Sequence, residues 1–164
     1  MHLTDRDTEI INWITDNKGA TIEQINKLFF TNYTTCSIRL KKLSDNKFLK
    51  AAVHPVLGKK VYYTKKMPSY HSLILNDFII KYKDNIKFIQ REYKIKKFIV
   101  DCIIILKTDK IIIVEIDIYN KTSKEKISNV MNTLKAAGAD FEFWIVCKGK
   151  RKDKIKEVKY IEYI

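Results

Sequence analysis

The sequence is poor in the residues that mark several classes of protein. Its 164 residues include three cysteines, four glycines and two prolines. The cysteines, at positions 36, 102 and 147, have no metal-binding spacing and do not suggest a disulfide framework. The glycines are too dispersed to form a phosphate-binding loop. These absences argue against a disulfide-rich domain, a zinc cluster and a P-loop nucleotide-binding protein.

Long apolar runs are also missing. No run approaches the ~18–20 residues that a membrane helix needs. The longest runs, over residues 102–106 and 111–114, have the length of strands. Residues 1–7 lack the basic and then apolar layout of a secretory signal. We therefore expect a cytoplasmic protein that does not contact membranes.

Positive charge is abundant in both halves of the chain. Lysine and arginine number 32 against 19 aspartates and glutamates, which gives a net charge of +13. Apolar residues make up 46% of the chain, so a core can form. A small protein with this charge attracts polyanions, and nucleic acid is the commonest of them inside cells. The charge does not distinguish DNA from RNA, or a binding protein from an enzyme.

A change of composition near Met67–Pro68 predicts two domains, over residues 1–67 and 68–164. In the first domain, Thr4 and Thr21 stand at the start of two helical patterns with capping-box spacing. The patterns that follow predict a third helix over residues 33–46 and strands over residues 48–53 and 60–64. Between these strands, Pro55 and Gly58 favour a hairpin turn, in which we expect His54 at the surface.

This order of elements resembles the winged helix-turn-helix family, most closely over residues 21–49. The resemblance implies that the third helix contacts double-stranded DNA in the major groove and that the hairpin reaches backbone phosphates. Arg39 has the donors for a bidentate contact with guanine. The residues expected to contact DNA are Thr34, Thr35, Ser37, Arg39, Lys41, Lys42, Lys59 and Lys60.

The second domain has the predicted element order αβββαβ. A helix over residues 69–82 precedes strands that are rich in β-branched residues, and Thr122 and Glu125 have the spacing of a capping box before a second helix. A buried strand over 141–147 follows, and an edge strand is expected over 158–164. Strands before and after a helix imply a mixed sheet with helices on its faces, an α/β (α+β) fold.

Three carboxylates in this domain lie on adjacent predicted strands. Asp101 lies in one strand, and Glu115 and Asp117 lie two residues apart in the next. The pattern resembles the PD-(D/E)XK nuclease fold, in which an acid and an acid-x-Lys motif converge on Mg²⁺. The resemblance makes Asp101, Glu115 and Asp117 candidate metal ligands and catalytic residues, because Mg²⁺ prefers carboxylate oxygens.

The motif departs from an active nuclease at one position, because Asp117 stands where the family has lysine. Lys124 or Lys126 in the following helix is a candidate replacement, and Asp77 is a further acid. The departure favours an inactive nuclease-like domain over one that cleaves DNA, so we lean towards a protein that is not an enzyme. DNA binding would require no cofactor, whereas cleavage would require Mg²⁺.

A narrower resemblance covers most of the chain. The segments YHSLILNDFIIKY (70–82), VDCIIIL (100–106) and VEIDIYNKT (114–122) are similar to the replication-relaxation family of Gram-positive plasmids and mobile elements. The resemblance implies a DNA-binding accessory protein of plasmid replication, relaxation or conjugative mobilisation. Its expected partners are double-stranded DNA, a second copy of the chain in a homodimer, and other replication or mobilisation proteins.

Two other functions remain open from the sequence. One is a Mg²⁺-dependent site-directed endonuclease that uses Asp101, Glu115 and Asp117. The other is a transcriptional repressor that uses only the DNA-binding half. The lysine-dense segment over residues 148–159 either adds a non-specific phosphate contact or forms a solvated loop.

Overall fold

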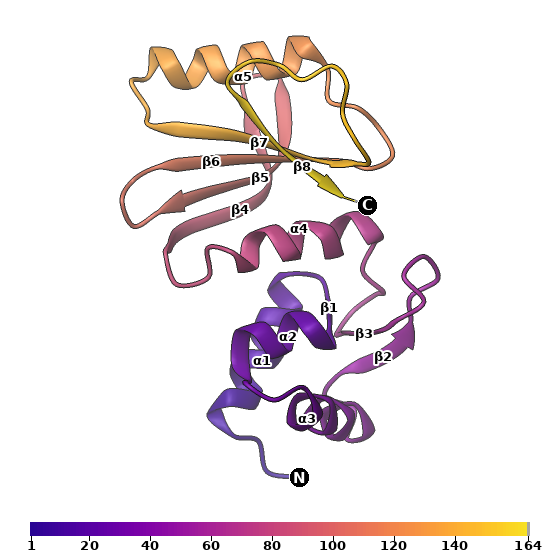
Figure 1. Ribbon diagram of the computed structural model, residues 1–164. Helices are drawn as coiled ribbons and strands as arrows, with labels where there is room; N and C mark the ends of the chain where they lie inside the picture. The colour runs from indigo at the N-terminus through magenta and orange to yellow at the C-terminus, as the bar shows by residue number, and fades with distance from the viewer. Residues whose placement is uncertain (164) are drawn as a thin grey trace. The chain divides into compact units, whose positions relative to one another are not determined.

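The computed structural model describes residues 1–163, which form two compact units (Figure 1). The first unit is Met1–Lys83 and the second begins at Asp84. Within residues 1–163 the fold is mixed α+β, with five α-helices, a three-stranded sheet and a five-stranded sheet. The expected α+β class is confirmed.

The first unit follows the predicted order of helices and hairpin. Its elements up to the hairpin are α1 (Asp5–Asp16), β1 (Ala20–Thr21), α2 (Ile22–Phe29), α3 (Tyr33–Asp45), β2 (Lys50–Val53) and β3 (Lys60–Tyr63). Both predicted capping boxes are present, at Thr4 with Asp7 and at Thr21 with Gln24. The strands pair antiparallel in the order β1-β3-β2.

Apolar residues from all three helices form the core of this unit. Ile10 of α1, Ile25 of α2 and Leu40 of α3 are fully buried, and Tyr62 of β3 is buried with them. The apolar positions recur at helical spacing, which is why the helices could be recognised in the sequence. Packing of this single core holds α3 with one face inward and the other in solvent.

The fourth helix, α4 (Tyr70–Ile80), belongs to the first unit, so the units divide after it and not at Met67–Pro68. Polar contacts explain this. Gln24 donates a hydrogen bond to the Leu73 carbonyl at 2.7 Å, and Asn76 donates one to the Gly19 carbonyl at 2.8 Å. These bonds satisfy buried polar groups on both sides, so α4 joins the helices that precede it.

The second unit is a five-stranded mixed sheet with a crossover helix. Its elements are β4 (Ile86–Ile95), β5 (Phe98–Leu106), β6 (Ile111–Asp117), α5 (Lys124–Ala136), β7 (Phe141–Lys148) and β8 (Val158–Tyr163). The strand order is β4-β5-β6-β7-β8; the first three strands pair antiparallel, and β6, β7 and β8 run parallel. The predicted edge strand is thus observed as β8, except for Ile164, which lies outside the described residues.

Helix α5 covers one face of this sheet (Figure 1). Ile127 and Val130 of α5 pack with Ile113 of β6 and with Phe143 and Ile145 of β7 in one buried cluster. Side chains alternate along a strand, so Glu115 and Asp117 of β6 share this face with Ile113. The carboxylates of Glu115 and Asp117 therefore lie on the face of the sheet that α5 covers, near the first turn of this helix.

None of the helices within residues 1–163 has the length and apolar character needed to cross a membrane.

Candidate nucleic-acid interface and carboxylate site

Helix α3 presents a polar face to solvent. Its buried stripe is Cys36, Leu40 and Leu43, as the sequence predicts, and the Asn32 side chain caps its first turn by accepting the Thr35 amide at 2.9 Å. Ser37 is half-buried. The side chains exposed along this helix include Tyr33, Thr34, Thr35, Ile38, Lys41 and Lys42.

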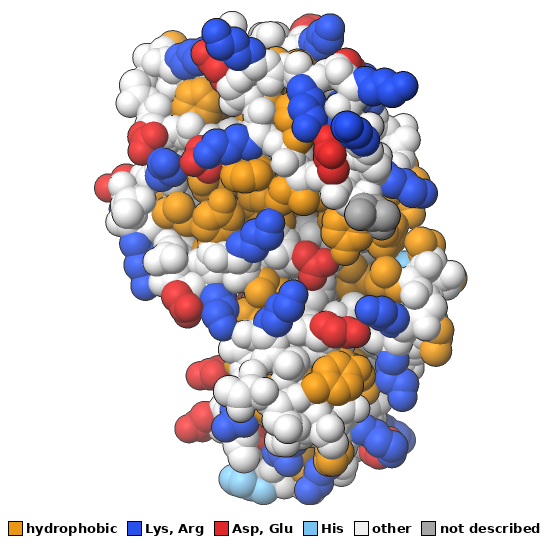
Figure 2. Space-filling model, in the orientation of Figure 1, with side chains coloured by type: hydrophobic (Ala, Val, Ile, Leu, Met, Phe, Trp, Pro, Cys, Tyr) orange, Lys and Arg blue, Asp and Glu red, His pale blue; other side chains and the backbone are white. Residues whose placement is uncertain are grey.

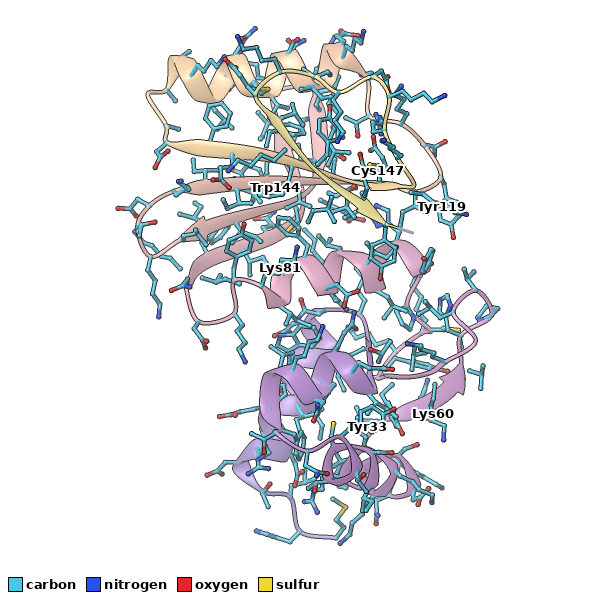
Figure 3. The ribbon with its side chains drawn as sticks, in the orientation of Figure 1. Tyr33, Lys60, Lys81, Tyr119, Trp144 and Cys147 are labelled. Carbon is cyan, nitrogen blue, oxygen red and sulfur yellow. The ribbon has the colours of Figure 1, made fainter. Side chains whose placement is uncertain are left out.

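The expected DNA-contacting lysines differ in their surroundings. Lys41 pairs with Asp45 at 2.6 Å, and Lys59 pairs with Glu23 at 3.2 Å. Lys42 and Lys60 have no acidic partner among residues 1–163. The free positive charge of this unit's candidate surface is therefore at Lys42 on α3 and at Lys60 on β3, whose side chain is labelled with Tyr33 in Figure 3.

Arg39 makes a different contact from the one expected for it. Its guanidinium binds the buried carboxylate of Asp7 in α1, with Nε donating to Oδ1 at 2.6 Å and Nη2 contacting Oδ2. The bond from Arg39 holds the pKa of Asp7 at about 2, below its ordinary value. The ion pair gives Arg39 a structural role inside the unit, and its expected contact with guanine stays a prediction.

Ile38 is a surface residue that sequence reasoning missed. It is 64% exposed in the middle of α3. It lies three or four positions from Thr34, Thr35 and Lys42, so it occupies the same face as they do. Its helical spacing was the available signal, because it falls outside the buried stripe.

His54 is buried and not at the surface as predicted. Its Nδ1 accepts the backbone amides of Val56 and Leu57 at 3.2 and 3.3 Å, and its Nε2 lies 3.1 Å from the Pro68 carbonyl. An Nδ1 that accepts two amides carries no proton, so Nε2–H is the donor to Pro68. The imidazole thus holds the β2–β3 turn closed.

Asp101 and Glu115 come together where β5 and β6 separate. The antiparallel pairing of these strands ends at Cys102 with Val114. Beyond it, Oδ2 of Asp101 accepts the backbone amide of Ile116 at 2.7 Å, next to Glu115. Lys126 of α5 forms an ion pair with Glu115, so the lysine predicted as a replacement reaches this carboxylate.

Glu115 is strongly affected by its position. It is 3% exposed. Burial and the neighbouring Asp101 carboxylate raise the pKa of Glu115 to about 8, and the Lys126 ammonium opposes this shift. A carboxyl group with this pKa exchanges its proton near neutral pH, which is a property found at catalytic acids and bases and at metal sites before metal binds.

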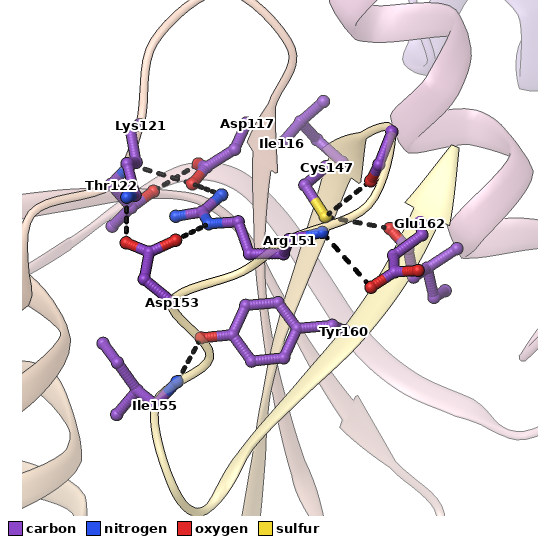
Figure 4. A network of polar contacts seen from close by, with 12 residues as sticks. Ile116, Asp117, Lys121, Thr122, Cys147, Arg151, Asp153, Ile155, Tyr160 and Glu162 are labelled. Carbon is purple, nitrogen blue, oxygen red and sulfur yellow. Dashed lines mark hydrogen bonds and ion pairs between the residues drawn. The ribbon is translucent and has the colours of Figure 1, made fainter. Parts of the chain in front are cut away.

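Asp117 faces a different set of partners from Glu115. Its carboxylate accepts the Thr122 amide at 2.9 Å and the Thr122 hydroxyl at 2.5 Å, and it pairs with Arg151 at 3.1 Å (Figure 4). Both the amide and the hydroxyl of Thr122 are bonded to Asp117. The N-cap of α5 is therefore Ser123 and not the predicted Thr122. Asp117 is a structural anchor for the loops that follow β6 and β7.

The three predicted metal ligands are therefore not gathered into one site. No group of three His, Cys, Asp or Glu side chains within residues 1–163 is arranged to hold a metal ion. Asp77 lies in the first unit, where it accepts a hydrogen bond from Gln24 at 2.8 Å. Two carboxylates, Asp101 and Glu115, remain as oxygen donors, and Mg²⁺ is commonly bound by one or two carboxylates together with water and substrate phosphate.

On the face shown in Figure 2, lysine and arginine side chains are spread over both units and do not form one patch. Among the predicted lysines of α5, Lys126 is half-buried beside Glu115, whereas Lys124 is exposed and has no acidic partner within residues 1–163. The two lysines thus have separate surroundings, although they lie only two residues apart in the sequence.

No protein-family model matches the sequence, and no curated protein matches it. Among solved structures, the chain is similar to a crystal structure of a repair endonuclease from Pyrococcus abyssi, with a TM-score of 0.38 and 15% sequence identity. The similarity covers 65% of this chain and 52% of that chain, so this chain spans about half the length of that structure. The resemblance to the replication-relaxation family stays a prediction.

Proposed function

We propose that this chain binds double-stranded DNA through α3 and the β2–β3 hairpin. The observation that supports this most directly is the composition of the exposed face of α3. One apolar stripe holds the helix in the core, while hydroxyls, an isoleucine and lysines remain in solvent. A helix of this kind enters the major groove in winged helix-turn-helix proteins, and the hairpin that follows contacts the backbone.

The side chains of this face match the chemistry of a duplex. Thr34 and Thr35 are short enough to approach base edges or phosphates from the first turn of the helix. Ile38 offers an apolar contact for a thymine methyl group. Lys42 and Lys60 have charge available for phosphates, which supplies affinity without sequence preference.

The narrower part of the proposal concerns the biological setting. On the resemblance of its three sequence segments, the chain acts as an accessory protein in plasmid or mobile-element replication, relaxation or mobilisation. As a homodimer it would place two copies of α3 on half-sites one helical turn apart. A footprint with two protected half-sites and a dimeric mass in solution would support this setting.

Anisotropy titrations of a labelled duplex at several salt concentrations test the proposal. The duplex is chosen by selecting bound sequences from a random library. Lys42→Gln removes one phosphate contact, so the negative slope of log K against log salt becomes shallower by about 0.9. Lys97→Gln is the matched control, because it removes the same charge from the second unit. Equal effects of the two substitutions would show that α3 is not the binding surface.

The second unit supports a second candidate function, a metal-dependent nuclease. The observation that favours it is the contact of Lys126 with Glu115, beside Asp101. Asp101, Glu115 and Lys126 then supply the two acids and the lysine of the nuclease motif, although position 117 has no lysine. Bound Mg²⁺ would supply a Lewis acid for the scissile phosphate and lower the pKa of attacking water. Lys126 would orient the water and Glu115 would accept its proton or hold the ion.

Supercoiled plasmid incubated with Mg²⁺ or Mn²⁺ distinguishes the two candidates. Nicking that is lost in Asp101→Ala, Glu115→Ala and Lys126→Met supports the nuclease. Glu125→Gln is the control on the same helix, because Glu125 is exposed and its ion pair is with Lys97, away from Glu115. If the plasmid stays intact with both metals while duplex binding persists, the nuclease candidate is rejected and the DNA-binding function is retained.

A further inference from the structure

A small cavity lies beyond the ends of β6 and β7. Its volume is about 200 Å³. It is bounded by the loop that leads into α5 and by the lysine-rich loop between β7 and β8. Both loops leave the carboxyl ends of parallel strands, the edge at which ligands bind in sheets of this kind. The lining residues are Lys121, Thr122, Ser123, Lys124, Arg151, Asp153 and Ile155.

Arg151 is held rigidly in the wall of this cavity. Its side chain is only 12% exposed. Nη1 donates to Asp117 at 3.1 Å and Nε donates to Asp153 at 3.2 Å, while the guanidinium lies 5.9 Å from the ring centroid of Tyr160 (Figure 4). A guanidinium has five donors in a planar fork, so these two bonds fix its orientation without using all of its donors.

The cavity has more cationic than anionic groups. Lys121 pairs with Asp153, and Arg151 is shared between Asp117 and Asp153. Lys124 has no acidic partner within residues 1–163. Three cations thus face two carboxylates, and one positive charge is uncompensated. An anion that enters is therefore favoured, because it meets an oriented guanidinium and a free ammonium.

Hydroxyl groups add the remaining recognition. Ser123 accepts the Lys126 amide at 3.2 Å, so its hydroxyl hydrogen is left to donate. Thr122 uses both its amide and its hydroxyl hydrogen on Asp117. A tetrahedral oxyanion with several acceptor oxygens suits this mixture of guanidinium, ammonium and hydroxyl donors better than a planar carboxylate does.

We propose that this cavity binds a phosphate group of a nucleic-acid strand. This inference rests on the proposed function in one respect, namely that the chain's partner is nucleic acid. The cavity lies beside Asp117, which follows Glu115 by two residues on the same face of β6, a separation of about 7 Å along a strand. A strand that crosses Asp101 and Glu115 would therefore bring a neighbouring phosphate to Arg151 and Lys124.

The phosphate can come from a strand end or from within a strand, and binding measurements separate these sources. Fluorescently labelled single-stranded oligonucleotides of one sequence are prepared with a 5′-phosphate or a 5′-hydroxyl. Each is titrated with the full chain at fixed salt in the presence of EDTA. A preference of about tenfold for the phosphorylated end identifies a terminal phosphate. Equal affinities, both lowered by Lys124→Gln, identify an internal phosphodiester.

Lys124→Gln is the main test variant, because Lys124 is exposed and its substitution should leave the fold intact. For a single strand, the substitution should make the negative slope of log K against log salt shallower by about 0.7. Lys135→Gln is the matched control, since it removes the same charge from the other end of α5, where Lys135 pairs with Glu157. Arg151→Gln is a second variant, used with a thermal melt because it also frees Asp117.

The inference is overturned if Lys124→Gln and Lys135→Gln weaken binding equally. That result is distinct from failure of the proposed function, in which Lys42→Gln leaves duplex binding unchanged. A chain that binds duplex through α3 and yet shows no effect of Lys124→Gln on single strands would retain the proposed function and lose this site.

Discussion

Arg39 of α3 and Asp7 of α1 form an ion pair in which the carboxylate is only 1% exposed. The same carboxylate accepts the Thr4 amide at 2.7 Å and closes the capping box of α1. One buried charge therefore joins the first turn of α1 to the middle of α3. The arginine for which the sequence predicts a guanine contact thus also fixes the position of the helix that carries the candidate DNA surface.

Arg39→Ala should destabilise the first unit strongly. Removal of one partner leaves the buried Asp7 carboxylate uncompensated, which costs about 3 kcal/mol. Urea denaturation at neutral pH measures the change, followed by tryptophan fluorescence in a Trp144→Phe background so that Trp13 of the first unit supplies the signal. Lys41→Ala is the control, because its pair with Asp45 is exposed and contributes little. An unfolding curve of Arg39→Ala that overlays the parent's would contradict this role.

Stability of the first unit should fall in acid because of Asp7. The folded pKa of Asp7 is about 2, below the ordinary value of 3.8. The contribution is therefore complete above pH 3.8 and is lost as the pH falls to about 2. It amounts to about 2 kcal/mol. Denaturation midpoints at pH 5, 3 and 2 measure it, and Asp7→Asn should remove this part of the pH dependence. An unchanged pH profile in that variant would exclude Asp7 as its source.

His54→Ala should loosen the β2–β3 turn. The substitution leaves the amides of Val56 and Leu57 and the Pro68 carbonyl without their partner, at a cost of about 1–3 kcal/mol. Hydrogen exchange of the two amides should accelerate. His54→Asn is the matched variant, because its Oδ1 can accept the same amides as Nδ1 does. If exchange is slow in the alanine variant, the imidazole does not hold this turn.

Glu115→Gln should stabilise the second unit in alkaline buffer without metal. Burial raises the pKa of Glu115 from 4.5 to about 8. A carboxyl group with a raised folded pKa stabilises the fold fully at low pH, and this contribution is lost as the pH rises through about 8. Glutamine stays neutral, so the variant should match the parent near pH 4 and exceed its melting temperature near pH 9. Equal melting temperatures at both pH values would contradict a raised pKa.

The sequence was most informative where local rules decide the structure. The apolar stripe of Cys36, Leu40 and Leu43 and the capping boxes at Thr4 and Thr21 were recognisable because their spacing follows the helical repeat. The strands of the second unit were equally clear from their β-branched runs. The prediction that Thr122 caps the second helix of this unit was wrong, because the Thr122 hydroxyl binds Asp117.

Long-range partners decided the rest, because spacing along the chain carries no information about them. The sequence by itself determined the α+β class, the order of elements and the candidates among the acids and lysines. Only the tertiary structure decided that Arg39 is paired with Asp7, that His54 is buried, and that Asp117 belongs to Arg151 while Lys126 reaches Glu115. The physical reason is that the role of a charged or polar side chain depends on the partner it contacts in the folded protein, and that partner is often distant in the sequence.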